Sequence, residues 1–205
     1  MTFISRRDLL KAAAIVPFAR GFQSGVRPAL ENLTAAEMQL LDAVVARLIP
    51  TDANGPGATE AMASHYIDHA LGDALASSKP AYSAGLAGLD RYARSSRGGP
   101  FAQLSPTDQD SVLIDVETGA ATGFTGSSAA FFAMVLGHTH QGTFGDPFYG
   151  GNANYVGWDL INYPGVRTMV NATDQKGLES KALKRIHKSA YEYDFTKAGE
   201  HHHDD

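Results

Sequence analysis

The chain has 205 residues, of which 43% are hydrophobic, and this is enough apolar material for one folded domain with a buried core. The formal net charge of -5 gives no electrostatic reason to expect a nucleic acid as a partner. The absence of cysteine excludes disulfides, thiolate-bound metals, iron–sulfur clusters and covalently attached haem on this chain. No apolar run approaches the about 18 residues of a membrane-spanning helix, so we expect membrane contact only indirectly, through a partner.

Residues 1–27 have the pattern of a twin-arginine export signal followed by a linker. Arg6 and Arg7 stand in Ser-Arg-Arg-Asp-Leu-Leu-Lys, which fits the twin-arginine pattern with leucine in the usual phenylalanine position. A short, weakly apolar run over residues 12–19 follows, as the central part of a signal requires. An ordinary basic helix start is the alternative interpretation. Because the twin-arginine translocase carries folded proteins, the signal predicts a periplasmic protein that folds before export.

The rest of the chain shows helical patterns and no alternating run that would indicate a strand. Thr34 and Glu37 form a capping box at the start of the first helix, and apolar residues then recur at helical spacing until Pro50 ends it. Ser105-Pro106 marks another helix start, with serine as the N-cap. Further helices are predicted over residues 59–75, 80–97, 105 to about 119, 127–138 and 174–188.

Residues 138–165 form a segment that is too rich in glycine, proline and asparagine for a helix and too rich in aromatics for a disordered loop. Its aromatic residues include Phe144, Phe148, Tyr149, Tyr155 and Trp158. Aromatic side chains bring large areas to bury, and glycines allow backbone angles that other residues avoid. The segment is therefore expected to be ordered by packing, either within this chain or against a partner.

The predicted fold is all-α, a single domain of about five or six helices that carries one long ordered loop. This domain is assigned to residues 28–170, and residues 171–205 are assigned to a basic helix with a polar tail. The cations of the basic helix are Lys176, Lys181, Lys184, Arg185 and Lys188. Such a helix is usually a solvated face, and its functional interpretation is docking to an acidic patch on a partner or to anionic lipid. Tyr191, Tyr193 and Phe195 behind it are candidates for insertion into a groove on a partner.

A spaced pattern of glycines, aromatics and turn residues runs through the glycine- and aromatic-rich segment. It consists of Gly142, Phe144, Asp146, Pro147, Tyr149, Gly150, Gly151, Asn152, Gly157, Trp158, Tyr163, Pro164 and Gly165. This pattern resembles the characteristic motif of the gluconate 2-dehydrogenase subunit 3 family. A second, less specific block is similar to that family at residues 48–52, 55–58 and 66–68. Together the similarity covers about residues 36–165.

The resemblance implies that the chain is the small, non-catalytic subunit of a periplasmic FAD-dependent sugar, sugar-acid or alcohol dehydrogenase of the GMC type. A large subunit would bind the FAD, and a c-type cytochrome with haem c would be a third subunit. This chain would carry no cofactor and no catalytic residue, and it would lend its export signal to the large subunit. The motif would brace the core and face the flavoprotein through Phe144, Asp146, Pro147, Tyr149, Gly150, Gly151, Asn152, Trp158, Pro164 and Gly165.

Four histidines are candidate metal ligands. His65 and His69 are one helical turn apart, a spacing that suits metal ligation but that also describes an exposed polar face. His138 and His140 would converge with Asp146 if the preceding helix ended just before them. Their alternative role is to form hydrogen bonds that fix the start of the loop. The metal interpretation is the second functional hypothesis, a stand-alone exported metalloenzyme with histidine ligands.

Asp146-Pro147 is interpreted as a turn rather than as a general base. An aspartate side chain binds the backbone that follows it, and a lone aspartate without a paired acid or histidine is a poor catalytic candidate. Stacking of a sugar on Trp158 and the tyrosines is the third hypothesis, which would make the chain a periplasmic sugar-binding protein. Core packing together with a partner interface anchored by Trp158 and Tyr149 is favoured over this hypothesis.

Overall fold

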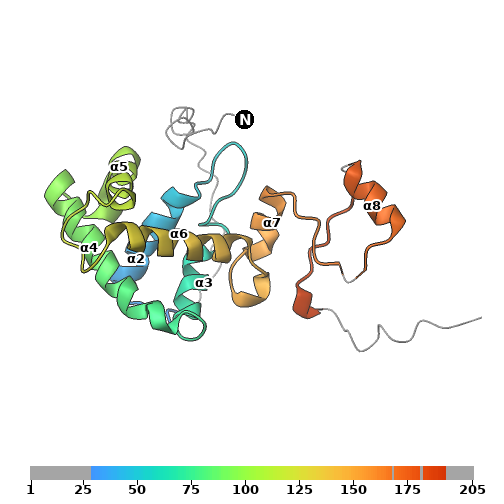
Figure 1. Ribbon diagram of the computed structural model, residues 1–205, viewed down its shortest axis with the longest axis horizontal. Coiled ribbons are helices and arrows are strands. Elements are labelled where there is room, and N and C mark those ends of the chain that lie inside the picture. Colours follow the sequence, from blue (N-terminus) through green and yellow to red (C-terminus); the bar gives the residue numbers. More distant parts are fainter. Residues whose placement is uncertain (1–28, 168, 181, 193–205) are drawn as a thin grey trace, which may run out of the picture.

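The computed structural model describes residues 29–167, 169–180 and 182–192, and within these ranges the chain is helical and forms no strand. The predicted all-α, single-domain fold is confirmed (Figure 1). The α-helices are α2 (Ala35–Leu48), α3 (Ala63–Ala70), α4 (Lys79–Arg97), α5 (Pro106–Glu117), α6 (Ser128–Phe144), α7 (Val156–Leu160) and α8 (Ala172–Glu179). Short 3-10 turns connect several of them. None of these helices combines the length and apolar character needed to span a membrane.

Helix α6 runs through the helical body and packs against α2, α3, α4 and α5 (Figure 1). The residues buried in this core include Leu41, Ile67, Tyr82, Leu86, Phe101, Val112 and Val135. Burial of each large apolar side chain is worth about 1.5–3 kcal/mol, so this shared core is the main stabilising feature of the fold. Helices α7 and α8 lie beyond one end of the body, where the C-terminal end of α6 also points (Figure 1).

The predicted helix starts are confirmed by their capping contacts. The backbone N–H of Thr34 donates to Glu37 Oε2 at 2.9 Å, and the N–H of Glu37 donates to Thr34 Oγ1 at 3.3 Å, so the capping box is present. Ser105 Oγ accepts a hydrogen bond from the Asp108 N–H at 3.2 Å. These contacts satisfy backbone donors that have no partner inside a helix.

Helix α3 is shorter than the predicted helix over residues 59–75. The chain forms turns before Ala63, and Met62 at the N-cap has a left-handed φ of 57°. The backbone N–H of Ala58 donates to the Ile49 carbonyl at 2.9 Å, which ties this segment to the end of α2. The contact with α2 therefore replaces the first helical turn that the residue pattern favoured.

Helix α6 is longer than predicted, because it continues past His138 to Phe144. The hydroxyls of Thr139 and Thr143 donate to the carbonyls four residues earlier, at 2.7 and 2.8 Å, and so stay within the helix. Gly142 faces α3, where a Cβ atom would lie 2.9 Å from the Tyr66 ring. This glycine allows two helices to approach closely, and it does not end the helix. The prediction that residues 138–165 are too rich in glycine, proline and asparagine for a helix is wrong for residues 138–144 and for α7.

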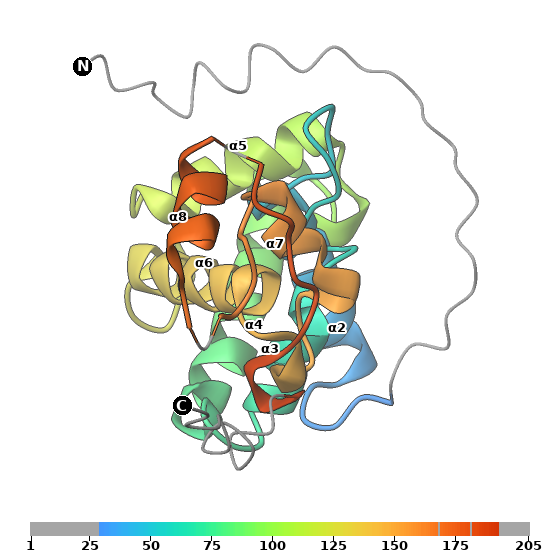
Figure 2. The ribbon, with the colours of Figure 1, turned by 90° about the vertical axis from the view of Figure 1, so that its right-hand side faces the viewer.

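The predicted helix over residues 174–188 is also wrong in its second half. Helix α8 ends at Glu179, and residues 182–189 are not helical. This part of the chain, residues 182–192, is called the strap below, because it returns along the glycine- and aromatic-rich segment (Figure 2). Its hydrogen bonds to that segment replace the helical hydrogen bonds that the sequence favoured.

Several predicted features lie outside the described residues. They include Arg6 and Arg7 of the export signal, and Tyr193 and Phe195 near the C-terminus. The twin-arginine signal and the proposed boundaries of the three segments therefore stay predictions.

Candidate functional site

Residues 145–165 follow α6 as a series of tight turns, which together with Gly142–Phe144 are called the motif below. Asp146 is the N-cap of the 3-10 turn Pro147–Tyr149, and its Oδ1 accepts from the Phe148 N–H at 2.9 Å. This geometry is the turn that Asp146-Pro147 predicted. Gly150 then reverses the chain with a left-handed φ of 88°, which glycine adopts at little cost.

Asn152 is the central side chain of the motif, and it is completely buried. Its Oδ1 accepts from the Gly157 N–H at 2.8 Å, while its Nδ2 donates to the Gly145 carbonyl at 2.9 Å. Its backbone N–H donates to the Gly142 carbonyl at 2.7 Å. One residue therefore joins the end of α6 to the start of α7. A buried amide with these partners braces the motif and leaves no free group for a ligand.

The motif packs its backbone segments unusually closely. A Cβ atom on Gly151 would lie 2.2 Å from the Gly142 carbonyl oxygen, and one on Gly157 would lie 1.8 Å from the Thr143 carbonyl oxygen. No other residue fits at either position without displacement of the backbone. Trp158, only 4% exposed, covers this contact and donates from its indole N–H to the Phe144 carbonyl at 2.9 Å.

The strap is bound to the motif through backbone hydrogen bonds. Asp146 Oδ2 accepts from the Ala190 N–H at 2.8 Å, and the Ile186 N–H donates to the Pro164 carbonyl at 3.1 Å. Gly165 leaves room for the strap, because a Cβ atom there would lie 2.2 Å from the Ile186 carbonyl oxygen. Burial alone would raise the pKa of Asp146, but hydrogen bonds from Ser189 and the backbone hold it below its usual value.

A second attachment of the strap involves Asp159 of α7. Its Oδ1 accepts from Arg185 at 2.7 Å and lies 2.8 Å from Nε2 of His187. Burial alone would raise the pKa of Asp159, but these hydrogen bonds outweigh it and hold the pKa low. The His187 ring also stacks on Tyr155, with centroids 4.9 Å apart. Polar and aromatic contacts thus hold the strap at both ends of its length.

Three aromatic side chains, Phe148, Tyr149 and Tyr191, meet on the surface where the strap crosses the motif and are called the aromatic triad below. Their exposed fractions are 60%, 47% and 56%. Phe148 stacks on Tyr191 with ring centroids 4.0 Å apart, and Tyr149 stands edge-on to both rings. The hydroxyls of Tyr149 and Tyr191 are hydrogen-bonded to each other. The triad thus combines two exposed aromatic side chains of the motif with one of the strap, whereas Trp158 of the motif is buried.

The structure does not bring His138, His140 and Asp146 together. His138 Nδ1 lies 3.0 Å from the Tyr82 hydroxyl, the His140 ring faces Phe144, and Asp146 binds the strap. Burial lowers the pKa of His138. Both histidines lie within α6, where residues two apart point in different directions.

His65 and His69 do not form a site either. His69 Nδ1 lies 3.0 Å from Glu31, whereas His65 Nε2 is buried and has no hydrogen-bond partner among the described residues. Over the described ranges, no group of three or more histidine, aspartate or glutamate side chains is arranged to hold a metal ion.

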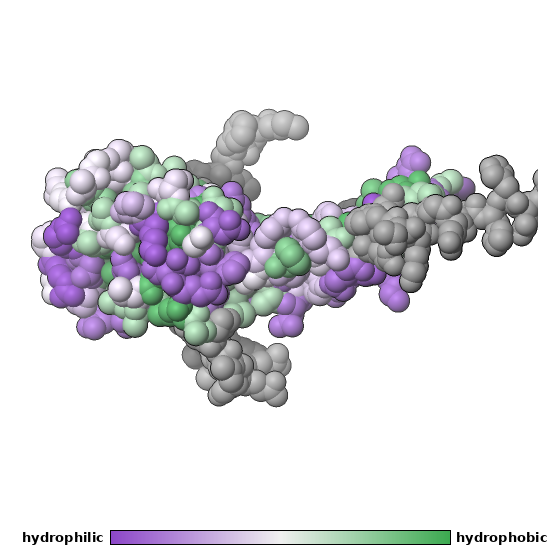
Figure 3. Space-filling model, turned by 90° about the horizontal axis from the view of Figure 1, so that it is seen from below, coloured by the Kyte–Doolittle hydropathy of each residue, from purple (hydrophilic) through white to green (hydrophobic). Residues whose placement is uncertain are grey.

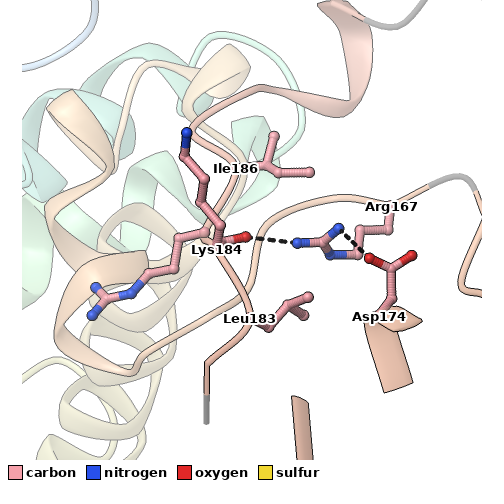
Figure 4. Close-up of a pocket in the computed structure, with 6 residues that line it drawn as sticks. Arg167, Asp174, Leu183, Lys184 and Ile186 are labelled. Carbon is pink, nitrogen blue, oxygen red and sulfur yellow. Dashed lines mark hydrogen bonds and ion pairs between the residues drawn. The ribbon is translucent and has the colours of Figure 1, made fainter. Parts of the chain in front are cut away.

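The described surface has hollows, and the residues that line two of them are known. One, of about 460 Å³, lies between the strap and α8, and Figure 4 shows the Arg167 guanidinium between the Lys184 carbonyl and Asp174. Arg167 donates to that carbonyl at 2.7 Å and to Asp174 at 3.3 Å, while the Lys184 amine points away (Figure 4). The other, of about 230 Å³, lies between α4 and α6 and is lined by both apolar and polar groups, among them Phe131 and Ser127. Neither hollow gathers acid–base or metal-binding side chains.

Sequence reasoning missed Asp68, which ends the second family-like block. It is 2% exposed and accepts from the backbone N–H groups of Glu31, Asn32 and Leu33 at 2.8, 3.0 and 2.7 Å. Asp68 therefore anchors the segment through which residues 1–28 join the folded domain. The signal that could have indicated this role is the position of Asp68 directly after the buried Ile67. A carboxylate that is buried almost always has partners.

The described chain is a small, all-α domain with a rigid, strap-covered motif at one end. A family model described as gluconate 2-dehydrogenase subunit 3 matches residues 35–165, and the chain belongs to this family. The match includes the whole motif, so the resemblance found in the sequence is confirmed, and the family description indicates a subunit of a larger dehydrogenase. No curated protein and no solved structure gives a significant match.

Proposed function

We propose that this chain is the non-catalytic small subunit and export escort of a periplasmic FAD-dependent dehydrogenase that oxidises a sugar, a sugar acid or an alcohol. The observation that carries the proposal is the family match over residues 35–165, because the family is itself described as a dehydrogenase subunit. In this proposal a GMC-type large subunit binds the FAD and the substrate, and a c-type cytochrome with haem c takes the electrons onward. This chain holds no cofactor.

The geometry of the motif supports a binding role over a chemical one. The polar groups of Asp146, Asn152 and Trp158 are engaged with backbone atoms of the chain itself. A general acid or base must reach a substrate proton, and these groups are already occupied in holding turns together. The exposed groups of the motif include the aromatic rings of Phe148 and Tyr149, which suit contact with another protein.

Export of the complex depends, in this proposal, on Arg6 and Arg7. The twin-arginine translocase accepts folded cargo, so a large subunit that has bound FAD in the cytoplasm would cross the membrane together with this chain. The small subunit thereby supplies the signal that its partner lacks.

The test is to purify the tagged full-length chain from the periplasm of its native host and to measure flavin absorbance in the eluate. The proposal predicts a yellow one-to-one complex with a larger flavoprotein. Replacement of Arg6 and Arg7 by lysine should remove both proteins from the periplasm, whereas Arg20→Lys with Arg27→Lys, in the same region, should not. A colourless chain that elutes alone would overturn the proposal.

A further inference from the structure

We propose that the strap completes the partner-binding surface of the motif. Tyr191 of the strap joins Phe148 and Tyr149 in an aromatic triad that inserts into an apolar recess edged by carboxylates on the flavin-bearing large subunit. This inference rests on the proposed function and adds to it a place of contact. It also gives a role to residues 182–192, which lie beyond the residues 35–165 that the family model matches.

The triad is exposed and already ordered. Its three side chains are between 47% and 60% exposed, although aromatic side chains of this size are usually largely buried. An aromatic side chain carries about 150–250 Å², so roughly 300 Å² of aromatic surface faces solvent here. This area is comparable to the largest apolar patch on a typical monomeric protein, and such a patch is often functional. The stacking of Phe148 on Tyr191 fixes both rings before a partner binds, which lowers the entropy lost on binding.

The chemistry of the triad fits a protein recess better than a sugar. Sugars are bound through several hydroxyl groups at once, and the polar groups at the triad already form hydrogen bonds within the chain. The Tyr149 and Tyr191 hydroxyls bind each other, and both carboxylate oxygens of Asp146 accept from backbone N–H groups. One face of the Tyr191 ring is covered by Phe148 and cannot stack on a ligand. What remains for a partner is apolar, and apolar rings are favourable at the dry centre of an interface.

The charges of the strap indicate what surrounds that recess. The strap carries the cations Lys184, Arg185 and Lys188 and one carboxylate, Glu192. Arg185 is paired with Asp159, and Glu192 accepts hydrogen bonds from Tyr155 and Ser189. Lys184 and Arg185 are exposed, and the narrow extension beyond the helical body shows hydrophilic and hydrophobic surface side by side (Figure 3). A basic strap beside an apolar triad is complementary to an apolar recess with an acidic rim. Opposite charges around an interface also speed association and exclude wrong partners.

The triad exists only while the strap is docked. The Ala190 N–H is held by Asp146, next to Tyr191, and Arg185 and His187 are held by Asp159. If the strap left the motif, Tyr191 would lose its stacking on Phe148. The contacts of Asp159 with the strap therefore position Tyr191, although Asp159 itself lies outside the aromatic triad.

The experiment measures binding of the full-length chain to the FAD-loaded large subunit obtained in the pull-down above. Phe148→Ala and Tyr191→Ala should each weaken binding on the order of 30-fold, as loss of an interface hot spot does. Tyr191→Phe, which keeps the stacked ring, should bind nearly as well as the wild type. Leu178→Ala is the matched control, because Leu178 is 55% exposed, apolar and located on α8 outside the triad.

A second readout tests the strap without the partner. Asp159→Ala should expose the strap to trypsin at Arg185 and Lys188 and should weaken binding to the same extent as Tyr191→Ala. If the wild type binds the flavoprotein and both aromatic variants bind it with unchanged affinity, this inference is overturned and the proposed function stays intact. A chain that binds no flavoprotein at all would overturn both. Tyr191→Ala could also bind the flavoprotein normally but lose self-association or binding to phosphatidylglycerol vesicles. Either result would assign the triad to another occupant and overturn the inference.

Discussion

The hydroxyl of Tyr82 lies 3.0 Å from Nδ1 of His138, and this contact joins α4 to α6 at the edge of the core. The two rings are also stacked, with centroids 5.8 Å apart. Burial raises the pKa of the Tyr82 phenol and lowers the pKa of the His138 imidazole. The fold therefore favours the neutral form of both residues, and protonation of His138 opposes folding.

The first prediction is that the protein loses stability in weak acid because of His138. The pKa of His138 in the folded chain lies below its ordinary value of 6.5, so its stabilising effect is complete above about pH 6.5. The effect is lost as pH falls through the folded-state pKa. Urea unfolding at pH values from about 7.5 to about 5 should show this decline in the wild type and a smaller decline in His138→Gln.

The carboxylates provide an internal control for this experiment. The pKa values of Glu37, Asp146 and Asp159 are all lowered from ordinary values of 4.5, 3.8 and 3.8, so their stabilisation is present above those values and is lost at more acid pH. The pH range in which these carboxylates change the free energy of unfolding therefore lies below the range in which His138 does. Identical pH dependence in the wild type and in His138→Gln would contradict the assignment.

The second prediction concerns two glycines of α6 that have opposite surroundings. Gly137→Ala should stabilise the protein by about 0.5–1 kcal/mol, because a Cβ atom there meets nothing within 4 Å and alanine favours the helix. Gly142→Ala should destabilise it by about 1–3 kcal/mol, because its Cβ atom would lie 2.9–3.0 Å from Tyr66 and Ala63. Thermal or urea unfolding of the two variants checks this. Equal effects of the same sign would show that α6 does not contact α3 at Gly142.

Features of the fold that depend on local contacts could be predicted from the sequence, whereas features that depend on distant contacts could not. The starts of α2 and α5 depend on local contacts, such as Ser105 with Asp108, and local contacts can be recognised in the sequence. The continuation of α6 past residue 138 brings Gly142 against α3, and this contact joins residues that are far apart in the chain. A count of glycines, which favoured a loop, cannot distinguish a helix breaker from a site of close packing.

The same distinction applies to the motif and the strap. The turn at Asp146 was predictable, because its side chain binds the N–H two residues later. The partners of Asp159 lie more than twenty residues away in the strap, where the lysine and arginine pattern favoured a helix. Docking onto the motif overrides that local preference. The aromatic content and the family-like spacing of the segment indicated that it was ordered, but they did not identify the strap as its partner.

The third prediction is that Asn152 contributes more to stability than any exposed residue of the motif. Asn152→Ala removes the acceptor of the buried Gly157 N–H and places alanine at a left-handed φ of 44°. We expect a loss of about 2–4 kcal/mol in the free energy of unfolding. Asn152→Gly should be milder, because it removes the hydrogen bonds but relieves the backbone strain.

The matched control is Asn154→Ala, at an exposed position with a similar φ of 54°. It should cost only about 1 kcal/mol, the backbone part of the effect. Urea unfolding midpoints give both values. If Asn152→Ala were no worse than Asn154→Ala, the hydrogen bonds of Asn152 would not be what braces the motif.

The fourth prediction concerns Asp68 and the segment that leads to the N-terminus. Asp68→Ala leaves the N–H groups of residues 31–33 without their acceptor, and a hydrogen bond to a charged group contributes about 1.5–3 kcal/mol net of exchange with water. Because this segment can reach solvent once it is released, we expect a net loss of about 3 kcal/mol and faster amide exchange at residues 31–33. Asp68→Asn should be intermediate, since it keeps one acceptor oxygen. Asp73→Ala, at an exposed position shortly after α3, should change neither quantity. Unchanged exchange at residues 31–33 in Asp68→Ala would show that Leu33 and its burial, rather than the carboxylate, hold this segment on the domain.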